Sequence, residues 1–256
     1  MKISRIIFYD EPSVPEINLE DLARFVQATT GILPEIKKPI LTLCGEKEFE
    51  KIASSRIFKL GMPYRRHLPN DEEIQFERTS LENASNQNII YYDGFELQNI
   101  FREMITDEES CQDIFHVIFT NKLTCTYDYN DYRYHGRAVI GSNPSIISTT
   151  GIIEAPAKPR EYYLELISKS RQGINIETLK EKYKGTFLEY HDSRLSIVIQ
   201  GYLLQALFYY ETGESFCDEK DCRLFNAHWQ KDLLHSQIES GKLCQKHQKI
   251  LKNMTT

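Results

Sequence analysis

The sequence predicts an α+β fold of α/β-like character, in which helices cover a mixed β-sheet, and three observations lead to this prediction. Residues 3–43 show a strand, helix, strand pattern, which is typical of a layered sheet. Residues 114–119 form a nearly continuous apolar run, as expected for a strand covered on both faces. After a proline-containing connector at residues 154–159 the chain becomes helical. We therefore expect a sheet portion at 1–153 and a helical portion at 159–256 within one compact unit.

Local signals define the elements of the sheet portion. An apolar run from Ile3 to Tyr9 predicts the opening strand, and Asn18 caps a helix that Gly31 ends. The other elements expected before the connector are a strand at 35–43, a helix at 46–60, an irregular polar region at 62–88, a helix at 95–105, strands at 114–119, 138–140 and 145–153, and a hairpin at 126–134.

Two features of this portion have both a structural and a functional interpretation. His116 lies within the central apolar run, and we expect a hydrogen-bonded core histidine there instead of a metal ligand. Tyrosines alternate with polar residues around Asn130 and Asp131, which predicts cross-strand tyrosine pairs in a hairpin. An exposed aromatic binding platform is the alternative interpretation of the same tyrosines.

The composition is that of an ordinary globular protein. Of the 256 residues, 27% are charged and 41% hydrophobic, and the net charge is −6, which argues against a nucleic-acid partner. Cys44, Cys111 and Cys125 lie far apart in the sequence, so we expect them to be reduced thiols. No apolar leader follows Met1, and with reduced thiols this predicts a cytoplasmic location.

The helical portion is expected to contain helices at 160–170 and 175–183 and a longer helix at 192–212. The longer helix has no charge between Arg194 and Glu211, and its apolar residues surround the helix axis. Its uncharged stretch is shorter than the roughly 20 residues that cross a bilayer. We therefore expect a central core helix, and no membrane partner.

Four residues that follow this helix have the spacing of a structural zinc site. Cys217, Cys222, Cys244 and His247 stand in the order C-x4-C-x21-C-x2-H. Two closely spaced pairs can supply three thiolates and one imidazole from opposite sides of a tetrahedral ion. The sequence therefore predicts one structural Zn²⁺, and removing it should melt the helical portion.

The order of a buried helix, a glycine turn and these cysteines resembles the archaemetzincins, a branch of the metzincin metalloproteases. In that family the active-site helix carries H-E-x-x-H-x-x-G-x-x-H-C, followed by x4-C-x-M and later by C-x-x-C. The second half of this pattern is matched by Gly213, Cys217, Cys222 and Cys244, with His247 in place of the last cysteine. The resemblance is specific over residues 190–252 and implies a metzincin-like fold.

The first half of the family pattern is absent. By this resemblance the three catalytic histidines fall on Ala206, Tyr210 and Phe216. The general-base glutamate falls on Leu207, and the methionine beneath the metal falls on Leu224. A catalytic zinc needs three good protein ligands, and peptide hydrolysis needs a carboxylate to accept a proton from the zinc-bound water. The alanine, leucine and phenylalanine supply neither, and a neutral phenol with a pKa near 10 is a poor zinc ligand. The resemblance therefore implies a divergent member that has lost HExxH and keeps its structural zinc.

Another set of residues offers a rearranged catalytic site. His228, Asp232 and His235 share one face of a helix expected at 226–240, and two histidines with a carboxylate can hold a metal. His191, just before the core helix, is placed to supply an acid or base to a pocket. The simpler interpretation makes the first three a solvated helix face and His191 part of a helix cap.

The leading hypothesis is a zinc-binding, archaemetzincin-like protein without peptidase activity. It would act as a binding or regulatory module that takes a protein or peptide partner in the old substrate groove along the sheet edge. The alternative is a metal-dependent peptidase or hydrolase with the rearranged site. A structural subunit of a larger assembly is the third interpretation.

Overall fold

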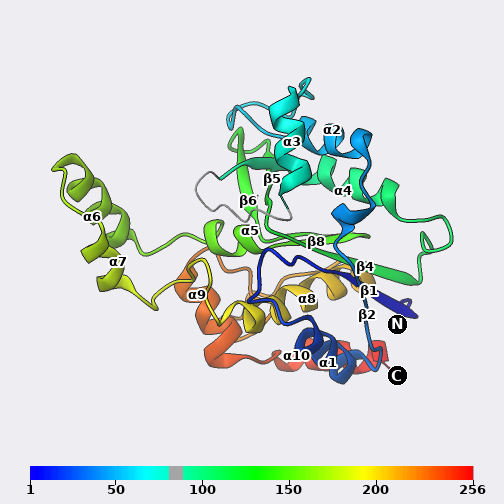
Figure 1. The fold of residues 1–256 in the computed structure, drawn as a ribbon. Coiled ribbons are helices and arrows are strands. Elements are labelled where there is room, and N and C mark those ends of the chain that lie inside the picture. Colours follow the sequence, from blue (N-terminus) through cyan, green and yellow to red (C-terminus); the bar gives the residue numbers. More distant parts are fainter. Residues whose placement is uncertain (81–88, 256) are drawn as a thin grey trace.

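The structure, a computed structural model, describes residues 1–80 and 89–255 and contains two β-sheets with helices packed around them (Figure 1). The larger sheet has the strand order β2-β1-β4-β8-β7. Its strands are β1 (Arg5–Tyr9), β2 (Glu35–Lys37), β4 (Ile114–Thr120), β7 (Val139–Ile140) and β8 (Ser145–Ser148). Neighbouring strands are parallel except β7 and β8, which are antiparallel, so the sheet is mixed as predicted.

A smaller sheet has the order β3-β5-β6. Its strands are β3 (Tyr91–Asp93), β5 (Leu123–Asp128) and β6 (Arg133–Arg137). β5 and β6 form the predicted hairpin, and Tyr127 pairs with Tyr134 across it with ring centroids 5.3 Å apart. Cross-strand pairing therefore accounts for these two tyrosines.

The helices surround the sheets and include one of 18 residues. They are α1 (Leu19–Thr30), η1 (Ile40–Leu43), α2 (Glu46–Ser54), α3 (Asp71–Thr79), α4 (Gly94–Met104), α5 (Thr149–Glu154), α6 (Arg160–Arg171), α7 (Glu177–Tyr183), α8 (Leu195–Thr212), α9 (Gln230–Leu234), η2 (His235–Ser240) and α10 (Gln245–Thr255). The predicted cap of α1 is confirmed, because the Asn18 side chain accepts a hydrogen bond from the Asp21 amide and Gly31 closes the helix in the left-handed conformation.

Strand β4 lies at the centre of two hydrophobic cores because all seven of its residues are buried. Phe115, Val117 and Phe119 face α1 and α8, whereas Ile114 and Ile118 face α4 on the other side of the sheet. Figure 1 shows α1, α8 and α10 on one side of the larger sheet and α2, α3 and α4 on the other. The prediction of a strand covered on both faces is confirmed.

His116 in β4 is a core histidine with hydrogen-bond partners, as predicted. The His116 Nδ1 atom lies 3.3 Å from the Tyr9 hydroxyl oxygen, and its Nε2 atom lies 2.9 Å from the Glu109 carbonyl oxygen. Burial lowers the pKa of this histidine, so the neutral ring is favoured.

Helix α8 is the predicted central helix. It is buried on nearly all sides and packs against β4 and β8 through one core and against the cysteine-rich segment through another. The core on the α8 side joins residues from both predicted portions of the chain, including Phe8, Phe115, Val198 and Leu203. Within residues 1–80 and 89–255, no helix combines the length and apolar character that crossing a membrane requires.

Three predicted elements of the first hundred residues are partly wrong. The strand expected at 35–43 ends at Lys37 and is followed by the short 3₁₀ helix η1. The helix expected at 46–60 ends at Ser54. The residues after it pair with β3 instead, because the Asp93 amide donates a hydrogen bond to the Ser55 carbonyl at 2.9 Å.

The region expected to be irregular at 62–88 contains helix α3. Asn70 begins this helix by accepting a hydrogen bond from the Glu73 amide, and Glu73 accepts one from the Asn70 amide. Asn70 and Glu73 form a capping box that the sequence already contains. The prediction of an irregular region rested instead on the polar composition of residues 62–88. The last part of the expected region, 81–88, lies outside the described residues.

The strand expected at 145–153 is also partly wrong, because β8 ends at Ser148. The Ser148 hydroxyl accepts a hydrogen bond from the Gly151 amide at 2.8 Å and so begins helix α5. A serine at this position satisfies an amide that has no partner within the helix.

The helix expected at 226–240 begins later than predicted and changes character. The Ala157 amide donates to the His228 carbonyl and the Gln230 amide donates to the Ala157 carbonyl, both at 2.8 Å. These bonds hold the backbone around Trp229 extended, so the α-helix starts at Gln230 and continues as the π-helix η2. His228 is therefore outside the helix.

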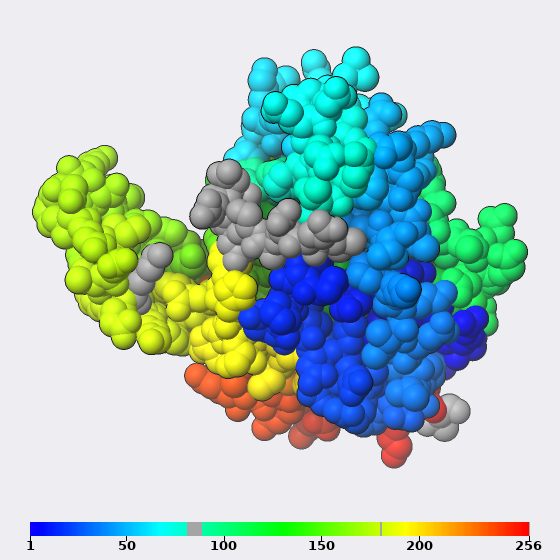
Figure 2. All heavy atoms as spheres, viewed as in Figure 1, coloured from blue at the N-terminus to red at the C-terminus, as the bar shows by residue number. Residues whose placement is uncertain are grey.

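The expected helices at 160–170 and 175–183 are confirmed as α6 and α7. They pack against each other around Tyr162, Leu179 and Phe187. Figures 1 and 2 show this pair projecting from the rest of the molecule.

Candidate metal centre and adjoining cleft

The four predicted zinc ligands come together from two chain segments. Gly213 ends α8 in a left-handed conformation with φ of 81°. This turn leads the chain to Cys217 and Cys222. Cys244 directly precedes α10 and His247 lies in its first turn. A backbone bridge between Cys217 and Phe225 closes the first segment on itself, and a bridge between Cys222 and Lys242 places the two segments side by side.

The spacing of the ligand atoms suits a tetrahedral ion. The Cys217 and Cys244 sulfurs are 3.9 Å apart, and His247 Nδ1 is 3.7 Å from the Cys222 sulfur and 3.1 Å from the Cys244 sulfur. All four ligand atoms lie within 4.8 Å of one another. Zn–S bonds of about 2.3 Å at tetrahedral angles place sulfurs about 3.8 Å apart, which is close to the observed separation.

Burial and backbone donors shape the chemistry of these thiols. Burial raises the pKa of the Cys217 thiol to about 12 and also raises the pKa of Cys222, whereas it lowers the pKa of His247. The Glu219 amide donates to the Cys217 sulfur and the Cys244 amide to the Cys222 sulfur, each at 3.4 Å. Amide donors of this kind favour a thiolate once a metal replaces the thiol proton.

A buried arginine directly follows one of the ligands in the sequence. Three thiolates and one neutral imidazole around Zn²⁺ carry a net charge of −1. Arg223 directly follows Cys222 and is buried, and within the described chain its guanidinium has no carboxylate partner. It donates to Gln200 Oε1 at 2.9 Å and to the Gln237 carbonyl at 3.2 Å. These contacts are with neutral groups. Four protein ligands around the ion fit a closed structural site.

A cleft of about 400 Å³ opens beside α8, between that helix, edge strand β7 and the loop after α8. Ala206 and Phe216, where the resemblance places the first and third catalytic histidines, both line it. Among residues 1–80 and 89–255, those that line the cleft include no Cys, Asp, Glu or His. The cleft therefore offers no ordinary side-chain ligand for a catalytic metal.

The remaining positions of the family pattern are filled by packing residues. Leu207 and Leu224 are buried in two hydrophobic cores. The Tyr210 hydroxyl donates to the Gln112 carbonyl at 2.6 Å, and its ring packs on Phe115 with centroids 5.0 Å apart. Each side chain is thus engaged in the body of the fold.

The cleft continues into a smaller cavity of about 90 Å³. The two share Arg137, Val139, Gln205 and Phe216, and we call them together the β7 groove. Arg137 and Gln205 are the polar side chains common to both parts. The sequence analysis missed both, because neither stands in a motif and only the fold brings β6 and α8 together.

The structure does not gather the alternative catalytic residues into one site. His228 is exposed and borders the smaller cavity of the groove. Asp232 pairs with Lys220 at 3.4 Å, and His235 lies 2.6 Å from Asp221 and 2.7 Å from Glu239. These charges of opposite sign make a solvated surface network.

His191 lies elsewhere, 2.8 Å from Glu16 at a cavity of about 20 Å³. Among the described residues, the other group with metal-ligand geometry is Asp128, Asp131 and His135 in the exposed hairpin. The Asp131 carboxylate in this group already accepts a hydrogen bond from Arg133 Nε at 2.9 Å and lies 2.8 Å from His135 Nε2.

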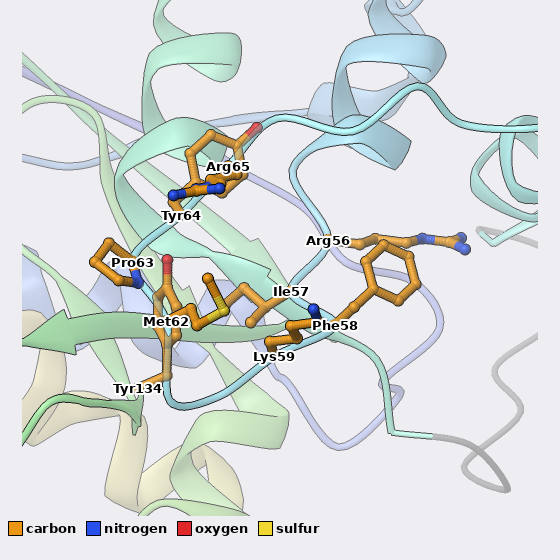
Figure 3. A pocket seen from close by; sticks show the side chains of 9 residues that line it. All are labelled: Arg56, Ile57, Phe58, Lys59, Met62, Pro63, Tyr64, Arg65 and Tyr134. Carbon is orange, nitrogen blue, oxygen red and sulfur yellow. The ribbon is translucent and has the colours of Figure 1, made fainter.

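A further cavity, of about 230 Å³, lies next to the β6 strand and is drawn in Figure 3. Its centre is formed by Ile57, Met62 and Tyr134, and Arg56 extends away from it toward Glu77. The Tyr134 hydroxyl already donates to Asp93 at 2.8 Å. The lining of this cavity is mainly apolar and also includes Lys59 and Arg65.

Comparison with known proteins gives a family match over nearly the whole chain. The profile of the family described as "Probable metallopeptidase family (DUF6775)" matches residues 2–254. No curated protein matches the chain. Among solved structures, the crystal structure of a zinc-dependent peptidase from Methanocorpusculum labreanum (strain Z) aligns with a TM-score of 0.44 and 13% sequence identity, covering 97% of this chain and 100% of that one.

Proposed function

We propose that this chain, which belongs to the probable metallopeptidase family, is a zinc-stabilised peptide-binding protein that does not itself cleave peptides. The observation that carries the proposal is the composition of the cleft beside α8. A zinc peptidase needs three protein ligands and a carboxylate base around an open metal position. Here the corresponding positions hold Ala206, Leu207, Tyr210 and Phe216, and the described residues that line the cleft include no Cys, Asp, Glu or His.

The metal in this proposal is one structural Zn²⁺ at Cys217, Cys222, Cys244 and His247. The separations of the ligand atoms and the full set of four protein donors support it. When bound, the ion would cross-link the loop after α8 to α10. The proposal includes a reducing compartment such as the cytoplasm, because the three cysteines must remain thiols to bind zinc.

Edge strand β7 supports the binding of an extended peptide. It pairs with β8 on one side, and the sheet ends at β7. A sheet edge beside a cleft can receive an added strand through backbone hydrogen bonds, while the cleft takes alternate side chains. The β7 groove provides both features, so a peptide or an extended segment of a partner protein is the expected ligand.

A cleavage assay on the zinc-loaded protein tests the absence of peptidase activity. We expect one zinc ion per chain and no peptide cleavage that a chelator abolishes. A second bound zinc, or chelator-sensitive cleavage by the purified protein, would overturn the proposal.

The alternative of a hydrolase with a rearranged site retains one supporting observation, since His228 borders the groove. The double variant His228→Ala and His235→Ala separates the two functions. A hydrolase that uses these residues should lose activity and keep its structural zinc, whereas our proposal expects the same background signal in both proteins.

A further inference from the structure

We infer that the β7 groove selects peptides that carry a carboxylate group, which Arg137 binds. This inference rests on the proposed peptide-binding function and deepens it by naming the chemical class of the ligand. Two residues that line both parts of the groove carry it: a cation without a carboxylate partner, and a buried side chain whose acceptor has no donor within the described chain.

Arg137 is the cation. Its half-buried side chain lines both parts of the groove, and its Nε donates to Thr126 Oγ1 at 2.7 Å. That bond orients the guanidinium and leaves its terminal amino groups available. Within the described chain no carboxylate lies within ion-pair distance of Arg137, and neither part of the groove is lined by Asp or Glu. In a chain of net charge −6, a cation without an anion in a cleft is a local attraction for a negative ligand.

Gln205 is the acceptor. The residue is 2% exposed, and its Oε1 has no hydrogen-bond partner in the part of the chain that the structure describes. The assignment of the amide follows from Nε2, which faces the Phe225 carbonyl at 3.4 Å. A buried acceptor without a donor is unfavourable, so a ligand that brings an N–H group into the groove would be stabilised there.

The two groups together describe the ligand. A guanidinium presents parallel N–H donors that match the two oxygens of a carboxylate, and Gln205 accepts from an N–H such as a peptide amide. The carboxylate can come from an acidic side chain or from a peptide C-terminus. Both sources offer the same group to Arg137, so the experiment must separate them.

Titration calorimetry with the zinc-loaded full chain tests this inference with four N-acetylated peptides of one apolar sequence. The peptides carry either glutamate or glutamine at the centre, and each is made with a free or an amidated C-terminus. We expect a carboxylate to strengthen binding by at least about tenfold, as a charge-assisted hydrogen-bonded pair should. The glutamate peptide with an amidated C-terminus and the glutamine peptide with a free C-terminus identify which source the groove prefers.

Arg137→Gln should abolish the preference, and Arg137→Lys should retain part of it because the charge remains. Arg133→Gln on the same strand is the matched control, since Arg133 is exposed and pairs with Asp131 at 2.9 Å. This control should keep the preference of the unaltered protein. If Arg137→Gln fails to fold, the affinities of the unaltered protein for the four peptides still test whether the groove selects a carboxylate.

The possible failures are distinct. Equal binding of all four peptides, or an unchanged preference in a folded Arg137→Gln protein, would overturn the carboxylate inference and leave peptide binding standing. Binding of none of them would contradict the proposed peptide-binding function as well.

Discussion

At the scale of single residues, Gly151 sets the position of the strand that carries Arg137. A methyl group at Gly151 would lie 2.0 Å from the Arg137 carbonyl oxygen and 2.8 Å from its carbonyl carbon. These are backbone atoms, which cannot rotate away as a flexible side chain can. Gly151 in α5 thus permits β6 to pass close to the start of that helix.

We predict that Gly151→Ala lowers the free energy of unfolding by about 1–3 kcal/mol, because the added methyl forces backbone shifts. Urea unfolding measures the change. Gly61→Ala is a suitable control, since its added carbon would meet nothing closer than the Tyr132 carbonyl at 4.0 Å. Equal stabilities of the two variants would show that β6 and α5 can separate without cost.

At the scale of elements, α3 is joined to the smaller sheet by a buried charge cluster. Glu77 of α3 accepts hydrogen bonds from the Lys122 ammonium at 2.5 Å, from Arg56 Nε at 2.9 Å and from the Tyr92 hydroxyl at 2.8 Å. Burial by itself raises the pKa of Glu77, but the charges of Lys122 and Arg56 outweigh it and lower the pKa below its usual range. The carboxylate is therefore ionised in the folded protein at neutral pH.

This cluster predicts a pH dependence of stability. Because the folded-state pKa of Glu77 is lowered, its contribution is complete above the unfolded-state pKa of about 4.3 and is lost as the pH falls through the folded-state pKa. We expect the urea concentration at the unfolding midpoint of the unaltered chain to decrease as the pH is lowered below about 4.3. The decrease should be smaller for Glu77→Gln, because glutamine has no proton to bind at this position.

The same substitution should be costly at neutral pH. Glu77→Gln leaves the buried Lys122 ammonium without its carboxylate, and we expect a loss of about 3–5 kcal/mol. Glu103→Gln removes an exposed partner of Lys51 and should change stability by less than about 1 kcal/mol. A similar small effect for both variants would mean that water reaches the Glu77 cluster.

At the scale of the whole molecule, the proposed zinc centre would close the C-terminal segment onto α8. Leu204 and Phe208 of α8 pack against Leu224, Leu243 and the ligand cysteines in a small core of their own. Because that core is small, the metal should supply much of the stability of this region; structural zinc sites bind with about 10–16 kcal/mol of free energy.

We predict that Cys222→Ser releases the zinc and melts the C-terminal segment, as a chelator should do to the unaltered protein. Zinc content and thermal unfolding monitored by circular dichroism are the measurements. Cys111→Ser is the matched control, because Cys111 is an exposed free thiol outside the cluster. An unchanged thermal midpoint after complete removal of zinc would show that the centre does not hold the segment.

The elements that sequence analysis predicted well are those whose local pattern and tertiary environment agree. β4 is continuously apolar because it is covered on both faces, and α8 is apolar on nearly all sides because cores surround it. Prediction was poorer where tertiary contacts override local preference. The helix expected at 226–240 starts late because Ala157, from a distant segment, bonds to its first residues, and α3 was missed because its buried Glu77 looks like a surface charge in the sequence.

The sequence by itself determined the candidate zinc ligands, the absence of an HExxH pattern and the core character of α8, because each depends on residue types at short spacing. Only the tertiary structure decided that Arg137 and Gln205 face one groove, and that the alternative residues His191, His228, Asp232 and His235 do not form one site. The physical reason is that charge pairing and hydrogen bonding act between atoms that are close in space. Arg137 in β6 and Gln205 in α8 are far apart along the chain, and they come close only when the strands pair and the helices pack.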